Sequence, residues 1–585
     1  MKSIKDKIPD PKELERELNS YLQKKYGGHV KLALPTFYPK TDSDHADSKK
    51  GSKKEETVAI DFDMKPEELE TYLDEYIIKQ REAKKILATK VCTHFNKIRL
   101  FEDKNKTNIH GVIGNIKNNI IMIGPTGVGK TYLIKLIAKK IGVPFVKGDA
   151  TKFTETGYVG GDVEDLVRDL VHETDGNINL AQCGIVYIDE IDKIASSPGL
   201  IGPDVSRTGV QRNLLKPLED TDVDLKVPHD PLSQLEAIEE FRKTGKRKKK
   251  TINTRNILFI VSGAFEGLED NIKKRLNKQG IGFGAEIKSQ NEETKFLNHV
   301  TAEDFITYGF ESEFVGRLPV TAIYERLEVD DLYQILKNLN STVILSKKND
   351  FKSYGIDVLF EDDALHILAE KAYKERTGAR GLVSAVEKTL LNFENKLPSS
   401  DIKKFVVTKS IALNPEKELE KLIANPFDKT MLERYEKLLS EEKAFMKTSL
   451  RKRDKELKDT YGIVLTDNRI DLLIDMAIDK RVDINTILEE LSLIIERVKA
   501  FEEWFLAKYS SKITFSYEAV DRIAGISMST NKDSFDVCRD IMKNYEHGFK
   551  LVKEQTGNNG FIITEDAIDD PDGYLSKLIK DSYSR

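Results

Sequence analysis

Cysteine, long apolar runs and net charge are all scarce in this chain of 585 residues. Its three cysteines, Cys92, Cys183 and Cys538, lie far apart and without metal-ligand spacing, which excludes a zinc finger and a disulfide framework. No apolar run approaches the roughly 20 residues of a membrane-spanning helix, and the first residues do not form a secretory signal. We therefore expect a cytoplasmic protein.

The formal net charge is only -5, although 33% of the residues are charged. Such a balance provides no overall attraction to nucleic acid or to an anionic membrane. With 39% hydrophobic residues, the composition is that of a charged globular protein. Its length exceeds what one core can organise, and predicts about three or four domains.

The first part of the chain predicts a linker followed by an α/β domain. Residues 1–64 include the polar stretch TDSDHADSKKGSKKEE, and a helix is expected to begin at Pro66. Apolar runs then alternate with helical segments over residues 65–326. Continuous apolar runs of this length suit the strands of a parallel sheet covered on both faces. The expected strands are Ile120–Ile123, Pro144–Val146, Ile185–Ile188, Ile257–Val261 and Val320–Tyr324.

The second part is predicted to be mainly helical. Residues 327–410 suit a small lid domain with a short strand around Lys404–Val407, and residues 411–585 read as a charged helical extension. The segment YGIDVLFEDDALHILAEKAY (354–373) resembles YGIVLTDNRIDLLIDMAI (461–478). The extension therefore contains either a degenerate second copy of the lid or a chance similarity between amphipathic helices.

A complete phosphate-binding loop follows the first expected strand and opens a helix, which is the context such a loop requires. Its glycines let backbone N–H groups turn toward phosphates, and the helix N-terminus adds positive potential. Lys130 is expected to neutralise the β- and γ-phosphates and Thr131 to ligate Mg²⁺, so that ATP and Mg²⁺ are the expected cofactors. The nucleotide-contacting residues are Gly124, Pro125, Thr126, Gly127, Val128, Gly129, Lys130, Thr131 and the adjoining Tyr132.

An acidic pair, Asp189 and Glu190, follows the apolar strand IVYI, at the edge where open α/β sheets bind ligands. Asp189 is expected to hold Mg²⁺ and Glu190 to polarise the attacking water. Ser262, at the end of another buried strand, either contacts the γ-phosphate or is only a turn residue. Together the loop and the acidic pair predict an ATP hydrolase.

Between these two motifs stands Gly157-Tyr158-Val159-Gly160. An aromatic and a branched residue between two glycines form a mobile apolar tip, which can grip a polypeptide without reading its sequence. The alternative is a tight turn whose Tyr158 packs on its own domain. The position between two nucleotide motifs favours gripping by Tyr158 and Val159.

Two arginines admit more than one interpretation. Arg317 lies among apolar residues, so its guanidinium either forms an ion pair within the domain or reaches a neighbouring subunit's γ-phosphate, as arginine fingers do. Arg380, near a helix start in the lid, either senses nucleotide or is a surface charge.

From about 66 to about 410 the chain resembles the ClpX family of AAA+ unfoldases, the ATPase partners of the ClpP protease. The resemblance rests on GPTGVGKT, GYVG, IVYIDEIDKI, GVQRNLLKPLE and LDEYIIKQREAKKIL. It implies an AAA+ P-loop large domain, a helical lid and a ring, with Arg317 as the trans-acting finger and Arg380 as the sensor-2 arginine. It places Tyr76, Ile77 and Ile78 near adenine, although Lys79 stands where the family usually has glycine. It also matches Ile281, Gly282 and Phe283 to the loop that docks into ClpP.

This chain departs from the family in three places. Residues 1–64 contain none of the four cysteines of the family's N-terminal zinc-binding domain, the run Lys246–Lys250 stands in the region of its Arg-Lys-His loop, and the extension passes its usual end. The related HslU unfoldases share GYVG but carry an inserted domain that is not found here. We expect an ATP-dependent, hexameric unfoldase of protein substrates, serving a ClpP-type peptidase. The rivals are a remodeller without a protease and, less favoured, a nucleic-acid motor.

Overall fold

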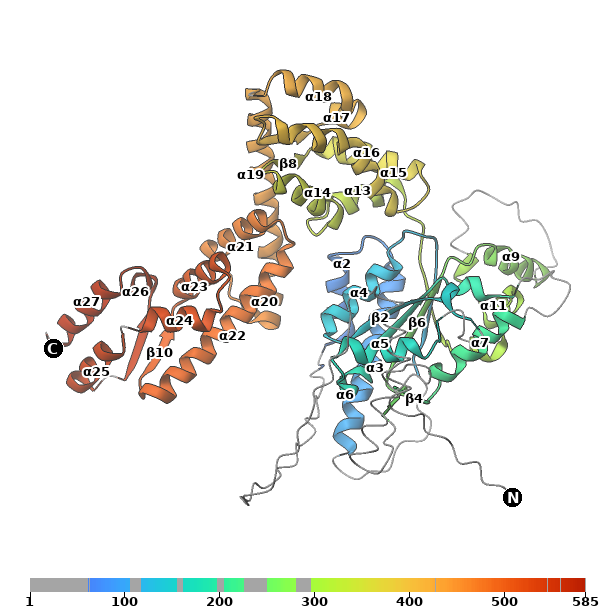
Figure 1. The fold of residues 1–585 in the computed structure, drawn as a ribbon, viewed down its shortest axis with the longest axis horizontal. Helices are drawn as coiled ribbons and strands as arrows, with labels where there is room; N and C mark the ends of the chain where they lie inside the picture. The colour runs from blue at the N-terminus through green and yellow to red at the C-terminus, as the bar shows by residue number, and fades with distance from the viewer. Residues whose placement is uncertain are drawn as a thin grey trace, which may run out of the picture.

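The computed structural model describes residues 62, 64–105, 117–154, 161–196, 205–225, 250–279, 296–426, 428–543, 545–557 and 559–583. Within these ranges the chain forms an α/β large domain, a small lid and a long C-terminal extension (Figure 1). No helix in these ranges is both long and apolar enough to cross a membrane.

The large domain is built on a parallel sheet of five strands in the order β2-β3-β6-β1-β7. All of β1 and β6, and the first four residues of β3, are buried because helices cover both faces. The predicted parallel sheet is confirmed, and each strand lies within a few residues of its expected position. The strands are β1 (Ile120–Ile123), β2 (Phe145–Asp149), β3 (Ile185–Asp189), β6 (Leu258–Gly263) and β7 (Val320–Ile323).

Helices and short elements connect and cover these strands. The helix that follows the phosphate loop, α4, runs from Lys130 to Ile141 between two glycines with positive φ, Gly129 (94°) and Gly142 (77°). Gly142 ends the helix in the left-handed conformation that glycine adopts readily. The others are α2 (Pro66–Asp74), α3 (Arg81–Asn105), η1 (Ala150–Lys152), α5 (Asp165–Glu173), α6 (Ile178–Ala181), η2 (Ile191–Ile194), α7 (Val205–Leu218), β4 (Asp222–Asp224), β5 (Thr251–Asn253), α9 (Leu268–Gln279), α11 (Ala302–Tyr308) and α12 (Ser312–Gly316).

The lid is helical with one short parallel strand pair, β8 (Asp357–Phe360) and β9 (Lys404–Val407), the second of which was expected. Ile411 and Leu422 are buried in the same core, so we propose that the lid runs to about residue 424 rather than 410. Its helices are α13 (Val329–Lys337), α14 (Thr342–Ser353), α15 (Asp362–Lys374), α16 (Arg380–Lys396), η4 (Leu397–Ser399), α17 (Lys409–Leu413) and α18 (Pro415–Ala424).

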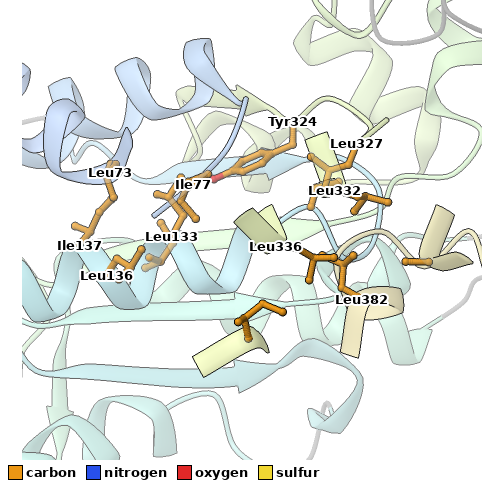
Figure 2. Close-up of a cluster of buried hydrophobic side chains, with 14 of the residues drawn as sticks. Leu73, Ile77, Leu133, Leu136, Ile137, Tyr324, Leu327, Leu332, Leu336 and Leu382 are labelled. Carbon is orange, nitrogen blue, oxygen red and sulfur yellow. The ribbon is translucent and has the colours of Figure 1, made fainter. Parts of the chain in front are cut away.

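One apolar core joins the lid to the large domain. Leu73 and Ile77 lie beside Leu133 of α4, and this cluster continues to Leu332 and Leu382 of the lid (Figure 2). Burial of apolar surface stabilises by about 25 cal/mol per Å². The two domains are therefore held together by packing as well as by the chain that connects them.

The extension begins with α19 (Lys429–Lys452), which packs on the outer face of β8 and β9 and leads to a separate cluster of helices (Figure 1). Tyr435 of α19 covers Leu359 and Val406 of the strand pair. Its remaining elements are α20 (Asp454–Tyr461), α21 (Asp467–Lys480), α22 (Ile484–Tyr509), β10 (Lys512–Phe515), α23 (Tyr517–Thr530), α24 (Ser534–Met542), α25 (Tyr545–Thr556), β11 (Gly560–Ile563), α26 (Glu565–Asp569) and α27 (Pro571–Tyr583).

The order of elements in the lid recurs at the end of the chain. The series β8, α15, α16, β9, α17, α18 corresponds to β10, α23, α24 with α25, β11, α26, α27, and each strand pair is parallel over four residues. The sequence similarity between residues 354–373 and 461–478 instead aligns α15 with α21. No strand precedes α21 in the described residues 462–466. A lid-like unit is therefore present in element order, but it begins at β10.

Candidate nucleotide site

The phosphate loop turns on three glycines with positive φ. Gly127 has a φ of 73°, and a Cβ at this position would lie 2.1 Å from the carbonyl oxygen of Thr377 in the lid. A Cβ at Gly124 would also overlap, since it would lie 2.6 Å from the Cβ of Tyr324. Only glycine avoids both the backbone strain and the overlap at Gly127. The loop is thus held between the sheet edge and the lid.

Lys130, the first residue of α4, lies buried beneath this loop. Its Nζ donates to the carbonyl oxygens of Gly124 (2.5 Å) and Pro125 (2.8 Å). Burial lowers the pKa of the ammonium to about 8, against the opposing attraction of Asp189 and Asp192. A cation held on loop carbonyls is poised to move onto a phosphate.

Asp189 receives hydrogen bonds at both carboxylate oxygens. Ser262 Oγ donates to Oδ1 (2.7 Å), while Lys147 Nζ (2.9 Å) and Thr131 Oγ1 (3.3 Å) donate to Oδ2. Burial raises its pKa, but the hydrogen bonds from Ser262 and Lys147 outweigh this and hold it below its usual value. The buried Tyr187 hydroxyl lies 2.6 Å from Ser262 Oγ and 3.0 Å from Thr131 Oγ1. The Asp189 carboxylate is therefore oriented and ionised beside the Thr131 hydroxyl, a pair of oxygens suited to Mg²⁺.

Glu190 differs from Asp189 in being exposed and in the left-handed conformation (φ 58°). A non-glycine residue rarely adopts this conformation. The left-handed conformation of Glu190 turns the chain sharply after β3, so that the side chains of Asp189 and Glu190 point in different directions. Glu190 lines the same cavity as Lys130 and Asp189.

The cavity has a volume of about 420 Å³ and extends from these polar groups to an apolar end. Pockets of this size suit small ligands and cofactors. The apolar end lies between the segment before α3, α4 and the lid. Its lining residues there include Tyr76, Ile77, Ile78, Tyr132, Leu327, Ile335, Val343 and Val383, and the loop residues from Thr126 to Thr131 line the other end.

The turn after Ile78 contains Lys79, which stands where the resemblance to the family leads one to expect glycine. Lys79 has a φ of 61° and the next residue, Gln80, a φ of 58°. Lys79 Nζ bonds Asp331 (2.9 Å), and the Gln80 amide exchanges two 2.8 Å hydrogen bonds with the Glu325 backbone. Lysine thus occupies a left-handed position where glycine is more easily accommodated, and its ion pair to the lid helix α13 offsets the strain.

The lid closes the cavity directly on the phosphate loop. The Ala379 N–H donates to the Gly127 carbonyl oxygen (2.8 Å), and Arg380 follows as the first residue of α16. Arg380 lines the cavity, and its charge acts on the pKa of Lys130. The structure therefore brings Arg380 together with the loop and the acidic pair.

Arg317 does not line this cavity. It caps α12 and forms an ion pair with Glu219, and both side chains are about half exposed (52% and 44%). The buried Gln211 links α12 to the turn after β3, because its Nε2 donates to the Ile194 carbonyl (2.8 Å) and its Oε1 accepts from the Glu311 N–H (2.8 Å). The GVQ segment thus fixes the element that carries Arg317.

Several residues singled out in the sequence lie outside the described residues. They are Tyr158 and Val159 of GYVG, Ile281, Gly282 and Phe283 of the proposed docking loop, and Lys246–Lys249 of the basic run.

Comparison with known proteins agrees with this geometry. Residues 115–321 match the family model "AAA domain (Cdc48 subfamily)", and residues 327–400 match "C-terminal, D2-small domain, of ClpB protein". The chain is 41% identical over 357 residues to "ATP-dependent Clp protease ATP-binding subunit ClpX" of Borrelia duttonii, which covers 60% of this chain and 79% of that protein. This chain belongs to the ClpX family.

Two further ClpX relatives are similar to this chain. The protein of the same name from Borrelia recurrentis is 41% identical over 357 residues, covering 60% of this chain and 79% of its own length. That from Treponema denticola is 39% identical over 338 residues, covering 57% and 77%. The chain is therefore a ClpX-type AAA+ ATPase that binds ATP, as predicted from its motifs.

Sequence reasoning did not single out Lys147, Tyr187 or Gln211. Tyr187 and Gln211 are polar residues within buried apolar segments, a pattern that could have identified them because buried polar groups need partners. Lys147 is exposed, and no such signal marks it. Ser262 was left open between two roles, and the structure places it beneath Asp189 as a hydrogen-bond donor.

Proposed function

We propose that this protein is an ATP-dependent unfoldase that threads polypeptides through the pore of a ring and delivers them to a ClpP-type peptidase. The observation that carries the proposal is the contact of the lid with the phosphate loop, through Ala379 and Gly127. Because one cavity is walled by both domains, a change from ATP to ADP alters the lid angle. Such a change is how hydrolysis can become mechanical work.

In this proposal each subunit supplies most of one ATPase site. Lys130 binds the β- and γ-phosphates, Thr131 and Asp189 hold Mg²⁺, and Arg380 responds to the γ-phosphate. Glu190 orients and polarises the attacking water. Mg²⁺ would offset the charge that develops on the transferring phosphoryl group. Adenine occupies the apolar end beside Ile77 and Ile78.

The neighbouring subunit supplies Arg317 to complete the site. The partial exposure of this side chain and its place outside the cavity of its own subunit support an action in trans. An arginine finger contributes roughly 10³- to 10⁵-fold to the rate in related phosphoryl transfers. The ion pair with Glu219 must open for the guanidinium to reach a neighbour.

Tyr158 and Val159 grip the substrate in the central pore. Substitution of Tyr158 by Ala should leave ATP hydrolysis largely intact and abolish unfolding of a stable tagged substrate, whereas Tyr158→Phe, which keeps the ring, should retain most unfolding. Fluorescence loss of a folded reporter, measured with ATP turnover in the same sample, tests this. Equal unfolding by the Ala and Phe variants would contradict the gripping role.

The partnership with a peptidase is tested separately. Added ClpP should degrade the folded reporter with the unsubstituted protein and not with Ile281→Ala/Phe283→Ala, while both proteins unfold it equally. Unfolding without degradation by either protein would favour the remodeller. ATPase stimulation by DNA with steep salt dependence would favour a nucleic-acid motor, which the net charge of -5 opposes.

A further inference from the structure

The C-terminal extension contacts both the large domain and the lid, the two domains that wall the nucleotide cavity. On the large domain, Lys140 at the end of α4 donates to the Tyr461 hydroxyl (3.0 Å). On the lid, the buried Arg481 pairs with Asp357 (2.5 Å). Leu339, in the lid loop between α13 and α14, also packs against the core of the extension. The extension is therefore in contact with both domains that wall the cavity.

The centre of this contact is Asn485 near the start of α22, which is 1% exposed. Its Nδ2 donates to Glu75 Oε2 (2.6 Å) and to the Tyr76 hydroxyl (2.9 Å), and its Oδ1 accepts from Arg453 Nη1 (2.8 Å). Arg453 also pairs with Glu75 Oε1 (2.8 Å). A buried amide bonded at both ends fixes the groups around it, because breaking any of these bonds leaves a polar atom without water.

Tyr76 connects this cluster to the cavity. Its side chain lines the apolar end, while its hydroxyl donates to Asp483 Oδ1 (3.2 Å) and accepts from Asn485. A phenol held at its oxygen has few positions left for its ring. The ring position at the cavity wall is thus set from within the extension.

The same cluster reaches the lid, at the loop between α13 and α14. The Glu75 carbonyl oxygen accepts from Asn338 Nδ2 (2.8 Å) and Asn340 Nδ2 (3.4 Å), and both asparagines line the cavity. Residue 75 therefore bonds the extension through its side chain and this lid loop through its backbone. Movement of the lid against the large domain is thereby coupled to Asn485 and Arg453, and the coupling is reciprocal.

We propose that Asn485 and Arg453 of the extension are positioning residues for nucleotide binding, which hold Tyr76 and the loop between α13 and α14 in the arrangement that accepts the base of ATP. The extension then acts as a brace across the cavity, and any partner that displaces it would change ATP affinity. The inference rests on the nucleotide site proposed above and concerns its affinity and not the threading of substrates.

The test uses the full chain and a fluorescent ATP analogue. Asn485→Ala and Tyr76→Phe should each raise the Kd and the KM for ATP, on the order of fivefold, with kcat nearly unchanged. The Kd of the double variant should not exceed the higher of the two single-variant Kd values, because both changes release the Tyr76 ring. The matched control is Lys443→Ala, which removes an exposed ion pair to Asp475 within the extension and should leave the Kd unchanged.

A purely structural role gives a different result. Asn485→Ala would then lower the melting temperature and leave the Kd of the folded protein at the unsubstituted value, which overturns the proposal. Additive effects in the double variant overturn it too. The variant Ile78→Ala tests the assignment of the nucleotide site independently of the role of Asn485, because Ile78 lines the cavity. If Ile78→Ala also leaves the Kd unchanged, the base does not bind there and the site assignment fails.

Discussion

At the scale of single residues, the site depends on polar groups that are buried beneath it. Ser262 is fully buried, and the hydrogen bond that it donates orients the Asp189 carboxylate and stabilises its negative charge. A hydrogen bond to a charged group contributes about 1.5–3 kcal/mol. A residue that does not line the cavity can therefore control the orientation of Asp189, the proposed Mg²⁺ ligand.

Ser262→Ala should lower kcat on the order of tenfold and raise the Mg²⁺ concentration that gives half-maximal ATPase activity. The reason is that Asp189 loses its 2.7 Å donor and becomes less well oriented beside Thr131. Thr389→Ala is the control, since it also removes a buried hydroxyl, one that bonds within α16. Unchanged Mg²⁺ dependence of Ser262→Ala would rule out the orienting role.

The pKa of Lys130 predicts a pH dependence of ATP binding. Burial lowers this pKa to about 8, and phosphate binds only the charged ammonium. Affinity is therefore full below about pH 8 and is lost as the pH rises through that value. Between pH 7 and 9 the Kd should increase about tenfold. Titration calorimetry near pH 8.5 in two buffers of different ionisation enthalpy should also record proton uptake on binding.

Lys130→Arg provides the control for this prediction. Guanidinium keeps its charge throughout this range, so the variant should bind more weakly overall but with a Kd that is constant from pH 7 to 9. A Kd that rises equally in both proteins would assign the titration to another group.

At the scale of elements, the junction of the phosphate loop and the lid is the contact that matters most to the proposed function. Gly127→Ala and Gly142→Ala both place a side chain at a φ near 75°, which costs about 1 kcal/mol. Only the first also meets the lid, because Gly142 has no atom within 4 Å of the added Cβ. Both variants should lose similar stability to backbone strain, but Gly127→Ala should in addition lose most ATPase activity. Thermal unfolding and ATP turnover measure the two effects. Full activity in Gly127→Ala would show that lid docking is dispensable.

The way the elements are built also explains which features of the fold and site could be predicted from the sequence. Continuous apolar runs of four or five residues such as Ile185–Ile188 suit buried strands, and glycine spacing identifies the phosphate loop, so the sheet and the motifs were predictable. The cluster around Asn485 was not, because Glu75 and Asn485 are 410 positions apart. No periodicity relates residues so distant, and each side chain by itself is an ordinary polar residue.

The similarity between residues 354–373 and 461–478 left a second lid and a chance resemblance equally open for a related reason. Apolar spacing makes any two amphipathic helices similar, as it does α15 and α21. Unevenly spaced residues discriminate better. Phe405, Thr408, Pro415 and Leu419 recur with the same spacing as Phe561, Thr564, Pro571 and Leu575, and they occupy corresponding elements. We propose that residues from β10 onward are a second, degenerate lid.

At the scale of the whole molecule, the two lid-like units differ in what covers their strand pairs. Val406 of β9 is fully buried under α19, whereas the corresponding Ile562 of β11 is 65% exposed. The first unit is thus built into the subunit, and the second ends the described part of the chain without such cover. The extension is attached to the ATPase by the polar cluster of Asn485 and by apolar packing of Tyr435 and Leu339.

The ring itself is tested by mixing two inactive subunits. Arg317→Ala keeps its own acidic pair but provides no finger, while Glu190→Gln provides a finger but cannot polarise water. If Arg317 acts across the interface, sites of the first variant beside a subunit of the second become complete. In a randomly mixed ring this holds for about a quarter of the sites, so ATPase activity should recover to at most about that fraction of the unsubstituted value.

The recovery of ATPase activity requires Arg317 to leave Glu219 and bind a phosphate of the neighbouring subunit. This requirement provides an internal check. Glu219→Gln weakens the pairing of Arg317 within its own subunit, so in the Glu190→Gln background it should increase the activity of the mixture without altering that of either protein alone. Activity that never exceeds the sum of the separate proteins would place Arg317 in a structural ion pair, the other interpretation that its apolar surroundings allow.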